Sequence, residues 1–147
     1  MNSLRWDPSV LIRGNKTPEF WSSHFNSSQR SVLFILGKGF DVRMNIAIQE
    51  LVKCCPTIKL ECWLIEFDEG AGSYSTKYLK HVQENEKKLN TCLTGKQIVT
   101  KKISLWNSKV KGKRKRIGDR QAAQILESYE QIKSFTDIII DISALPR

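Results

Sequence analysis

The chain has 147 residues, of which 40% are hydrophobic and 27% are charged. This length and balance are typical of one globular domain that buries a core without disulfide bonds, and they exclude a wholly disordered chain. No apolar run has the length of a membrane span, and residues 1–10 contain no hydrophobic stretch of the kind that directs secretion. These features indicate a cytoplasmic protein.

The net charge of +9 is concentrated in one segment of the chain. Residues 101–120 contain nine lysines or arginines and one acid, Asp119, so this segment alone accounts for +8. A basic surface favours polyanionic partners but does not specify a fold. Any argument for a nucleic acid partner therefore rests on this segment.

Residues 1–30 are expected to form an irregular lead-in that packs across the outside of the core. They contain several aromatic side chains but no sustained periodicity, apart from one short helix predicted near residues 19–25. The pattern becomes regular at residue 31. The run SVLFILG (31–37) is unbroken and apolar, which is typical of a strand covered on both faces.

The next part of the chain predicts a helix, a strand and a second helix. After Asp41, apolar residues recur three and four positions apart, which predicts a helix that Pro56 ends. Residues 58–67 predict the second strand, and residues 75–93 predict the second helix. The apolar stripe of this second helix comprises Tyr78, Val82, Leu89, Cys92 and Leu93.

The last third of the chain predicts two more strands around a third helix. Residues 96–106 form a strand that is rich in lysine, as sheet edges often are. After a basic loop at 107–118, Asp119 is predicted to cap the third helix. The apolar stripe of that helix comprises Ala122, Ile125, Leu126, Tyr129 and Ile132. A fourth strand follows, with isoleucine at 138, 139, 140 and 142.

Alternation of strands and helices predicts the fold class over residues 31–147: α/β, a Rossmann-like three-layer α/β/α domain with a mostly parallel sheet of about four strands. In the expected strand order 3-2-1-4, the isoleucine-rich last strand lies at an edge. Because its pattern is that of a buried strand, we expect that the chain is part of a longer polypeptide or, less favoured, that another subunit covers this edge.

The carboxyl ends of parallel strands share one rim, where ligands bind in sheets of this kind. The first strand ends in FILGKGFDVRMN, where glycines permit close approach and a helix N-terminus attracts anions, as a nucleotide phosphate requires. Against this, Val42 replaces the last glycine of G-x-G-x-x-G, and Lys38 is not followed by Ser or Thr. A ligand site and a purely structural corner capped by Asp41 are both open. The candidate ligand-binding residues are Gly37, Lys38, Gly39, Phe40, Asp41 and Arg43.

Two other strand ends supply further candidates. Asp68 is placed to hold ribose hydroxyls or else lies in a solvated turn, and Glu66 is the alternative, expected on the opposite face. The last strand ends in DISALPR, which offers Asp141, Ser143 and Arg147. Arg147 either binds a phosphate or carboxylate bidentately or is a surface residue. The ligand site requires the first and last strands to be parallel neighbours.

The remaining chemistry is limited. The four cysteines lack metal-binding spacing and are interpreted as reduced core residues, and neither histidine has a nucleophile beside it in the sequence. No metal is predicted, and a nucleotide is the one cofactor or ligand that the pattern favours. The alternative function is a nucleic-acid-binding module, whose contacts would come from Lys109, Lys111, Lys113, Arg114, Lys115 and Arg116.

The motifs GKGFDVR and DISALPR resemble those of poorly characterised bacterial Rossmann-like proteins that are loosely associated with phage defence. The resemblance covers these two motifs and the spacing between them, and it does not cover the lead-in. It implies a nucleotide-type site at the strand ends, formed by the glycine turn together with Asp141, Ser143 and Arg147. It implies no particular reaction.

Overall fold

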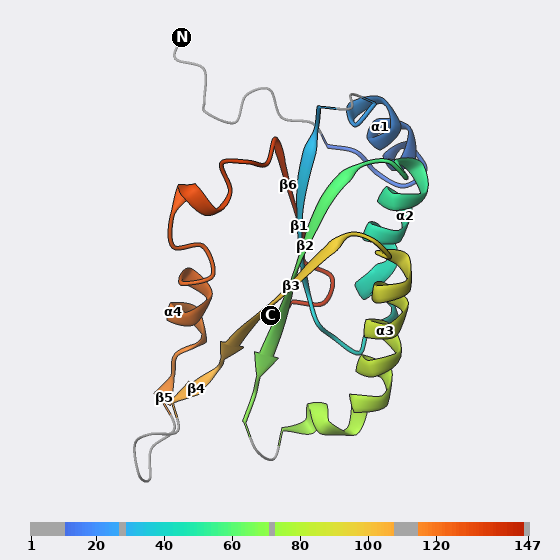
Figure 1. Ribbon diagram of the computed structural model, residues 1–147. Coiled ribbons are helices and arrows are strands. Elements are labelled where there is room, and N and C mark those ends of the chain that lie inside the picture. Colours follow the sequence, from blue (N-terminus) through green and yellow to red (C-terminus); the bar gives the residue numbers. More distant parts are fainter. Residues whose placement is uncertain (1–10, 27–28, 71–72, 108–114, 146–147) are drawn as a thin grey trace.

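The computed structural model describes residues 11–26, 29–70, 73–107 and 115–145 (Figure 1). Its centre is a four-stranded sheet in the order β3-β2-β1-β6, and every pair of neighbours is parallel. The strands are β1 (Ser31–Gly37), β2 (Lys59–Asp68), β3 (Gln97–Ser104) and β6 (Asp137–Asp141). The protein therefore has the Rossmann-like α/β architecture and the strand order that the sequence predicts.

One face of the sheet is covered by three α-helices (Figure 1). They are α1 (Lys16–His24), α2 (Ile46–Cys54) and α3 (Leu79–Cys92), and two 3-10 turns, η1 (Val42–Asn45) and η2 (Tyr74–Tyr78), precede α2 and α3. Their apolar sides bury the larger part of the core, including Phe34, Leu36 and Leu89. Phe25, just after α1, belongs to the same core, so the end of the lead-in packs against the domain as expected.

The opposite face has a thinner cover, which corrects the prediction of a long third helix. Helix α4 (Gly118–Ala123) has six residues, and only a 3-10 turn, η3 (Tyr129–Gln131), follows it. Ser128, which lies between α4 and η3, has extended backbone angles (φ −151°, ψ 156°), so the two do not form one continuous helix. Asp119 lies inside α4, where Ile117 takes the cap position. Ile125 and Ile132 still pack on the sheet from irregular chain.

The sequence prediction did not include the small two-stranded sheet that follows β3. The third strand ends at Ser104, and β4 (Trp106–Asn107) pairs antiparallel with β5 (Lys115–Arg116). At the other edge, β6 leaves Ile138 and Ile140 exposed by 45% and 60%. Within the described part of the chain, no helix is both long and apolar enough to cross a membrane.

Candidate functional site

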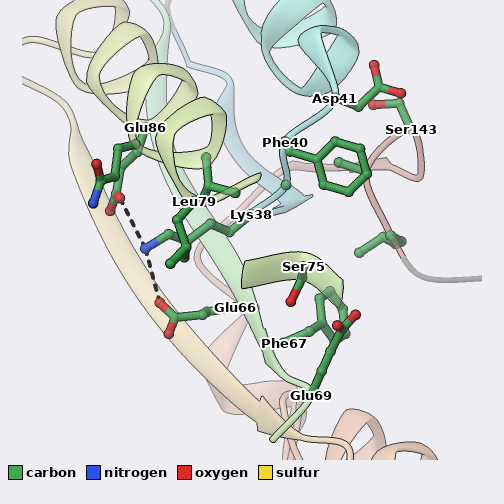
Figure 2. Close-up of a pocket in the computed structure, with 15 residues that line it drawn as sticks. Lys38, Phe40, Asp41, Glu66, Phe67, Glu69, Ser75, Leu79, Glu86 and Ser143 are labelled. Carbon is green, nitrogen blue, oxygen red and sulfur yellow. Dashed lines mark hydrogen bonds and ion pairs between the residues drawn. The ribbon is translucent and has the colours of Figure 1, made fainter. Parts of the chain in front are cut away.

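A cavity of about 490 Å³ lies at the carboxyl rim of the sheet (Figure 2). The turn after β1, the end of β2, the first turns of α3 and the turn after β6 form its walls. Its volume is in the range of small-molecule sites. The polar lining comprises Lys38, Asp41, Glu66, Glu69, Ser75, Gln83, Glu86 and Ser143. The apolar and aromatic lining comprises Phe40, Phe67, Leu79, Val82, Ala144 and Leu145.

The first and last strands meet as the ligand-site prediction requires. β1 and β6 are parallel neighbours, with Leu36 beside Asp141. The turn after β6 consequently packs against the turn after β1, and the Ser143 hydroxyl donates a hydrogen bond of 3.4 Å to the Arg43 carbonyl oxygen. Ser143 lines the cavity. Arg147 lies outside the described residues, so its predicted contact is not tested.

This close approach gives both glycines of the turn a structural role. A Cβ at Gly37 would lie 2.6 Å from the Ala144 carbonyl oxygen, which is inside any tolerable contact. A Cβ at Gly39 would lie 3.2 Å from the Ala144 Cβ. Neither glycine has a positive φ. Both are therefore explained by the proximity of the last turn, whether or not a ligand binds.

The helix N-terminus at this turn is already occupied by a carboxylate. Asp41 Oδ1 accepts the Arg43 backbone N–H at 2.9 Å and caps η1, as the structural alternative proposed. The Arg43 guanidinium folds back onto Asp41 at 2.6 Å, and these hydrogen bonds lower the pKa of Asp41 to about 2. The Gly39 N–H donates to the Met44 sulfur at 3.4 Å. These contacts weaken the case for a phosphate bound at this turn.

Asn85 positions the glycine turn, and the sequence analysis missed it. Its side chain is 3% exposed and donates hydrogen bonds to the carbonyl oxygens of Gly39 and Asp41, at 3.0 and 2.9 Å. The Asn45 side-chain amide donates a hydrogen bond of 2.9 Å to the backbone carbonyl oxygen of Asn85. The signal was a polar residue on the apolar stripe of α3, three residues after Val82 and four before Leu89.

Lys38 occupies one side of the cavity between two glutamates (Figure 2). Its Nζ lies 3.1 Å from Glu66 Oε2 and 3.1 Å from Glu86 Oε2, and its side chain is 19% exposed. Burial opposes the positive charge, but the hydrogen bonds to Glu86 and Glu66 outweigh it and raise the pKa of Lys38. Lys38 is thus a charged residue whose bonding capacity is largely used within the protein.

The end of β2 supplies Glu66 to the cavity, and Asp68 does not line it. Lys102 Nζ lies 4.0 Å from Glu66 and 3.8 Å from Asp68, so both carboxylates project from the same face of β2. The expectation of opposite faces was wrong, because strand side chains alternate with a period of two residues. Asp68 Oδ1 accepts the Gly70 N–H at 2.9 Å, which is the contact of a turn residue.

Asp141 and Phe40 complete the set of predicted residues. Asp141 Oδ1 accepts the Ser143 N–H at 2.8 Å, whereas its Oδ2 is buried and has no hydrogen-bond partner among the described residues. Phe40 is 48% exposed at the cavity and stacks on Tyr78, with ring centroids 4.4 Å apart and planes at 20°. Tyr78 was predicted to face the core, but it is 42% exposed.

The basic segment lies only partly within the described residues. Lys115 and Arg116 are exposed on β5, whereas Lys109, Lys111, Lys113 and Arg114 are outside the described ranges. In the described part, no group of three or more His, Cys, Asp or Glu side chains has metal-binding geometry. All four cysteines lie in the core or at its margin, as predicted, and the structure has them as free thiols. Comparison with known protein families and with curated proteins found no match.

Proposed function

We propose that the cavity at the carboxyl rim binds a nucleotide-type ligand through its nucleoside part. The observation that carries the proposal is the combination of a half-exposed aromatic ring, that of Phe40, with carboxylates around one cavity. Phe40 offers a stacking surface for a base, and the oxygens of Glu66, Glu69 and Glu86 can accept hydrogen bonds from ribose hydroxyls. The cavity lies at the carboxyl ends of the strands, where ligands usually bind in this architecture.

The experiment is a calorimetric titration of the whole chain with adenosine, guanosine, cytidine and uridine. At least one nucleoside is expected to bind, and Phe40→Ala is expected to weaken that binding by about tenfold, because base stacking is lost. Val42→Ala is the matched control, since Val42 is 74% exposed on the same turn but does not line the cavity. Absence of binding to every nucleoside, or equal effects of the two variants, would contradict the proposal.

The resemblance to bacterial Rossmann-like proteins extends this proposal to a biological setting. In that setting the domain is the sensing or catalytic part of a defence-associated protein. The carboxylates of the cavity are then the groups to test for action on a ribosyl bond. Incubation of the binding nucleoside with the protein, followed by chromatography for the free base, tests for such a reaction.

A second proposal, nucleic acid binding, rests on the exposure of Lys115 and Arg116 on β5. Two other lysines of the same segment are engaged in the protein: Lys101 lies 4.6 Å over the Trp63 ring, and Lys102 pairs with Glu66 and Asp68. Binding to duplex or single-stranded DNA should therefore depend on the loop at 107–118. Neutralising Lys113, Arg114, Lys115 and Arg116 together should abolish binding that falls steeply with salt, and should leave nucleoside binding unchanged.

The edge of the sheet at β6 supports a further proposal, that another subunit or another part of a longer polypeptide covers it. Ile138, Ile140 and Ile142 are exposed by 45%, 60% and 75%, and β6 has an unpaired edge among the described strands. Sedimentation analysis distinguishes the two forms of cover. If self-association occurs, Ile140→Lys should abolish it, and a monomer at every concentration would contradict cover by a second copy.

A further inference from the structure

The electrostatics of the cavity restrict the ligand more than its shape does. Four carboxylates line the cavity, those of Asp41, Glu66, Glu69 and Glu86, and Lys38 is the one cation in the described lining. The lining therefore has a formal charge of −3. A phosphate group placed inside would add to this surplus of negative charge and would be repelled by the carboxylates.

The nearby cations do not reverse this surplus. Lys38 is held at 3.1 Å by both Glu66 and Glu86, so binding a phosphate would require it to give up these contacts. Arg43 is outside the lining and is paired with Asp41 at 2.6 Å. Lys102 is also outside the lining and is shared between Glu66 and Asp68. Even with Arg43 included, the formal charge of the described residues at the cavity is −2.

The four carboxylates that line the cavity differ in their hydrogen-bond and ion-pair partners. Glu66 and Glu86 share one ammonium group, Asp41 is paired with Arg43, and Glu69 accepts a hydrogen bond from the Ser73 hydroxyl. The apolar wall of Phe67, Leu79 and Leu145 lies beside them. Such a lining suits a molecule with one flat apolar part and several hydroxyl or N–H donors, because bonds from such donors to carboxylates are charge-assisted.

We propose, on the basis of the nucleotide-type site above, that the cavity selects ligands whose enclosed part carries no negative charge, a nucleoside in preference to its phosphate ester. The cavity thereby distinguishes nucleosides from nucleotides by charge. The glycine turn, which in many related sheets receives a phosphate, here closes the cavity with the Asp41 carboxylate instead.

The test compares each nucleoside with its 5′-monophosphate by calorimetry at low salt, using the whole chain. The monophosphate is expected to bind at least about tenfold more weakly than the nucleoside, and the difference is expected to shrink as salt screens the charges. Equal or tighter binding of the monophosphate would overturn this inference and leave the proposed binding function intact. If neither class binds, the proposed function itself fails, and this inference fails with it.

Two glutamate variants show which charge is responsible for the preference for a nucleoside over its monophosphate. Glu86→Gln keeps the shape of the cavity and removes one carboxylate, so it should narrow the difference between nucleoside and monophosphate by about threefold or more. Glu84→Gln makes the same change on the same helix at a residue outside the lining, where Glu84 contacts His81 at 3.6 Å. Glu84→Gln should leave the difference in affinity between nucleoside and monophosphate unchanged. Equal effects of the two variants would overturn the assignment of selectivity to the cavity.

Discussion

Two groups of charged residues lie at opposite ends of the strands. We call these ends the amino edge and the carboxyl edge of the sheet, and the carboxyl edge is the rim that holds the cavity. At the amino edge, Asp137 at the start of β6 is a single carboxylate surrounded by donors: Arg30 Nη1 contacts its two oxygens at 2.9 and 3.0 Å, the His24 ring lies at 2.9 Å, and the Thr136 hydroxyl donates at 2.6 Å. Its side chain is 14% exposed. At the carboxyl edge, four carboxylates and one lysine line an open cavity, and the lysine contacts two of the carboxylates, Glu66 and Glu86.

The difference separates a structural ion pair from the proposed binding site. Both groups contain buried or half-buried acids, and both contain a carboxylate whose pKa is lowered, Asp137 in one and Asp41 in the other. Only the group at the carboxyl edge combines an excess of one charge with empty space. A buried charge that has full complements of partners supports the fold, whereas surplus charge beside a cavity is available to a ligand.

The largest expected effect comes from Asn85, which lies at the carboxyl edge and whose buried side-chain amide donates two hydrogen bonds within the protein. Asn85→Ala removes the donors for two carbonyl oxygens in the glycine turn and should lower the free energy of unfolding by about 3 kcal/mol. Chemical denaturation measures this change. Asn90→Ala, at an exposed position of the same helix, is the control, and equal destabilisation by both variants would show that Asn85 does not hold the turn.

The next largest effect on stability is expected from the ion pair that Asp137 forms at the amino edge. Asp137→Asn keeps the shape of the side chain but weakens its bonds with Arg30 and His24, so the free energy of unfolding should fall by about 2 kcal/mol. The exposed Glu127→Gln should change it by less than about 0.5 kcal/mol. If Asp137→Asn is as stable as the wild type at pH 7, the pair does not contribute to stability and the contrast between the two edges is lost.

The ion pair of Asp137 also predicts that the free energy of unfolding depends on pH. Burial raises the pKa of Asp137, but hydrogen bonds from Thr136, His24 and Arg30 outweigh burial and lower it below the ordinary value of 3.8. A lowered folded-state pKa gives stability that is fully present above the unfolded value and is lost as the pH falls through the folded value. The stability difference between wild type and Asp137→Asn should therefore shrink below about pH 4. A difference that stays constant down to pH 2 would contradict this origin.

The smallest effect on stability is expected from the surplus carboxylates. Glu86→Gln leaves Lys38 paired with Glu66 and relieves repulsion among acids, so the free energy of unfolding should stay within about 0.5 kcal/mol of the wild type. Thermal and chemical denaturation both report it. A loss as large as that of Asp137→Asn would make the carboxyl edge another structural network and would end the distinction drawn between the two edges.

The fold could be predicted from sequence because its signals are local. Continuous apolar runs identified β1 and β2, and alternation of strands and helices suggested the Rossmann strand order 3-2-1-4, which the structure has. The third helix was predicted wrongly because Ile125 and Ile132 have helical spacing yet reach the sheet from irregular chain. Apolar spacing alone does not distinguish these two arrangements, and the extended Ser128 between them has no clear sequence signal.

The site was less predictable, because it depends on which side chains pair with one another. Lys38, Phe40, Asp41 and Ser143 were correctly placed at one rim, since strand ends fix them. The role of the glycines could not be derived, because it depends on Ala144, about a hundred residues away in the chain but packed against the turn. The surplus of carboxylates was equally hidden, since Glu86 reaches the cavity from helix α3, which the strand-end argument does not cover, and Glu69, which directly follows β2, was not singled out.

The central claim is that the carboxyl-rim cavity binds the nucleoside part of its ligand against Phe40. The most direct measurement is the calorimetric titration of the four nucleosides into the wild-type chain and the Phe40→Ala variant under identical conditions. The account predicts measurable binding of at least one nucleoside to the wild type and about tenfold weaker binding to the variant. Undetectable binding of all four to the wild type, or the same affinity for both proteins, would contradict it.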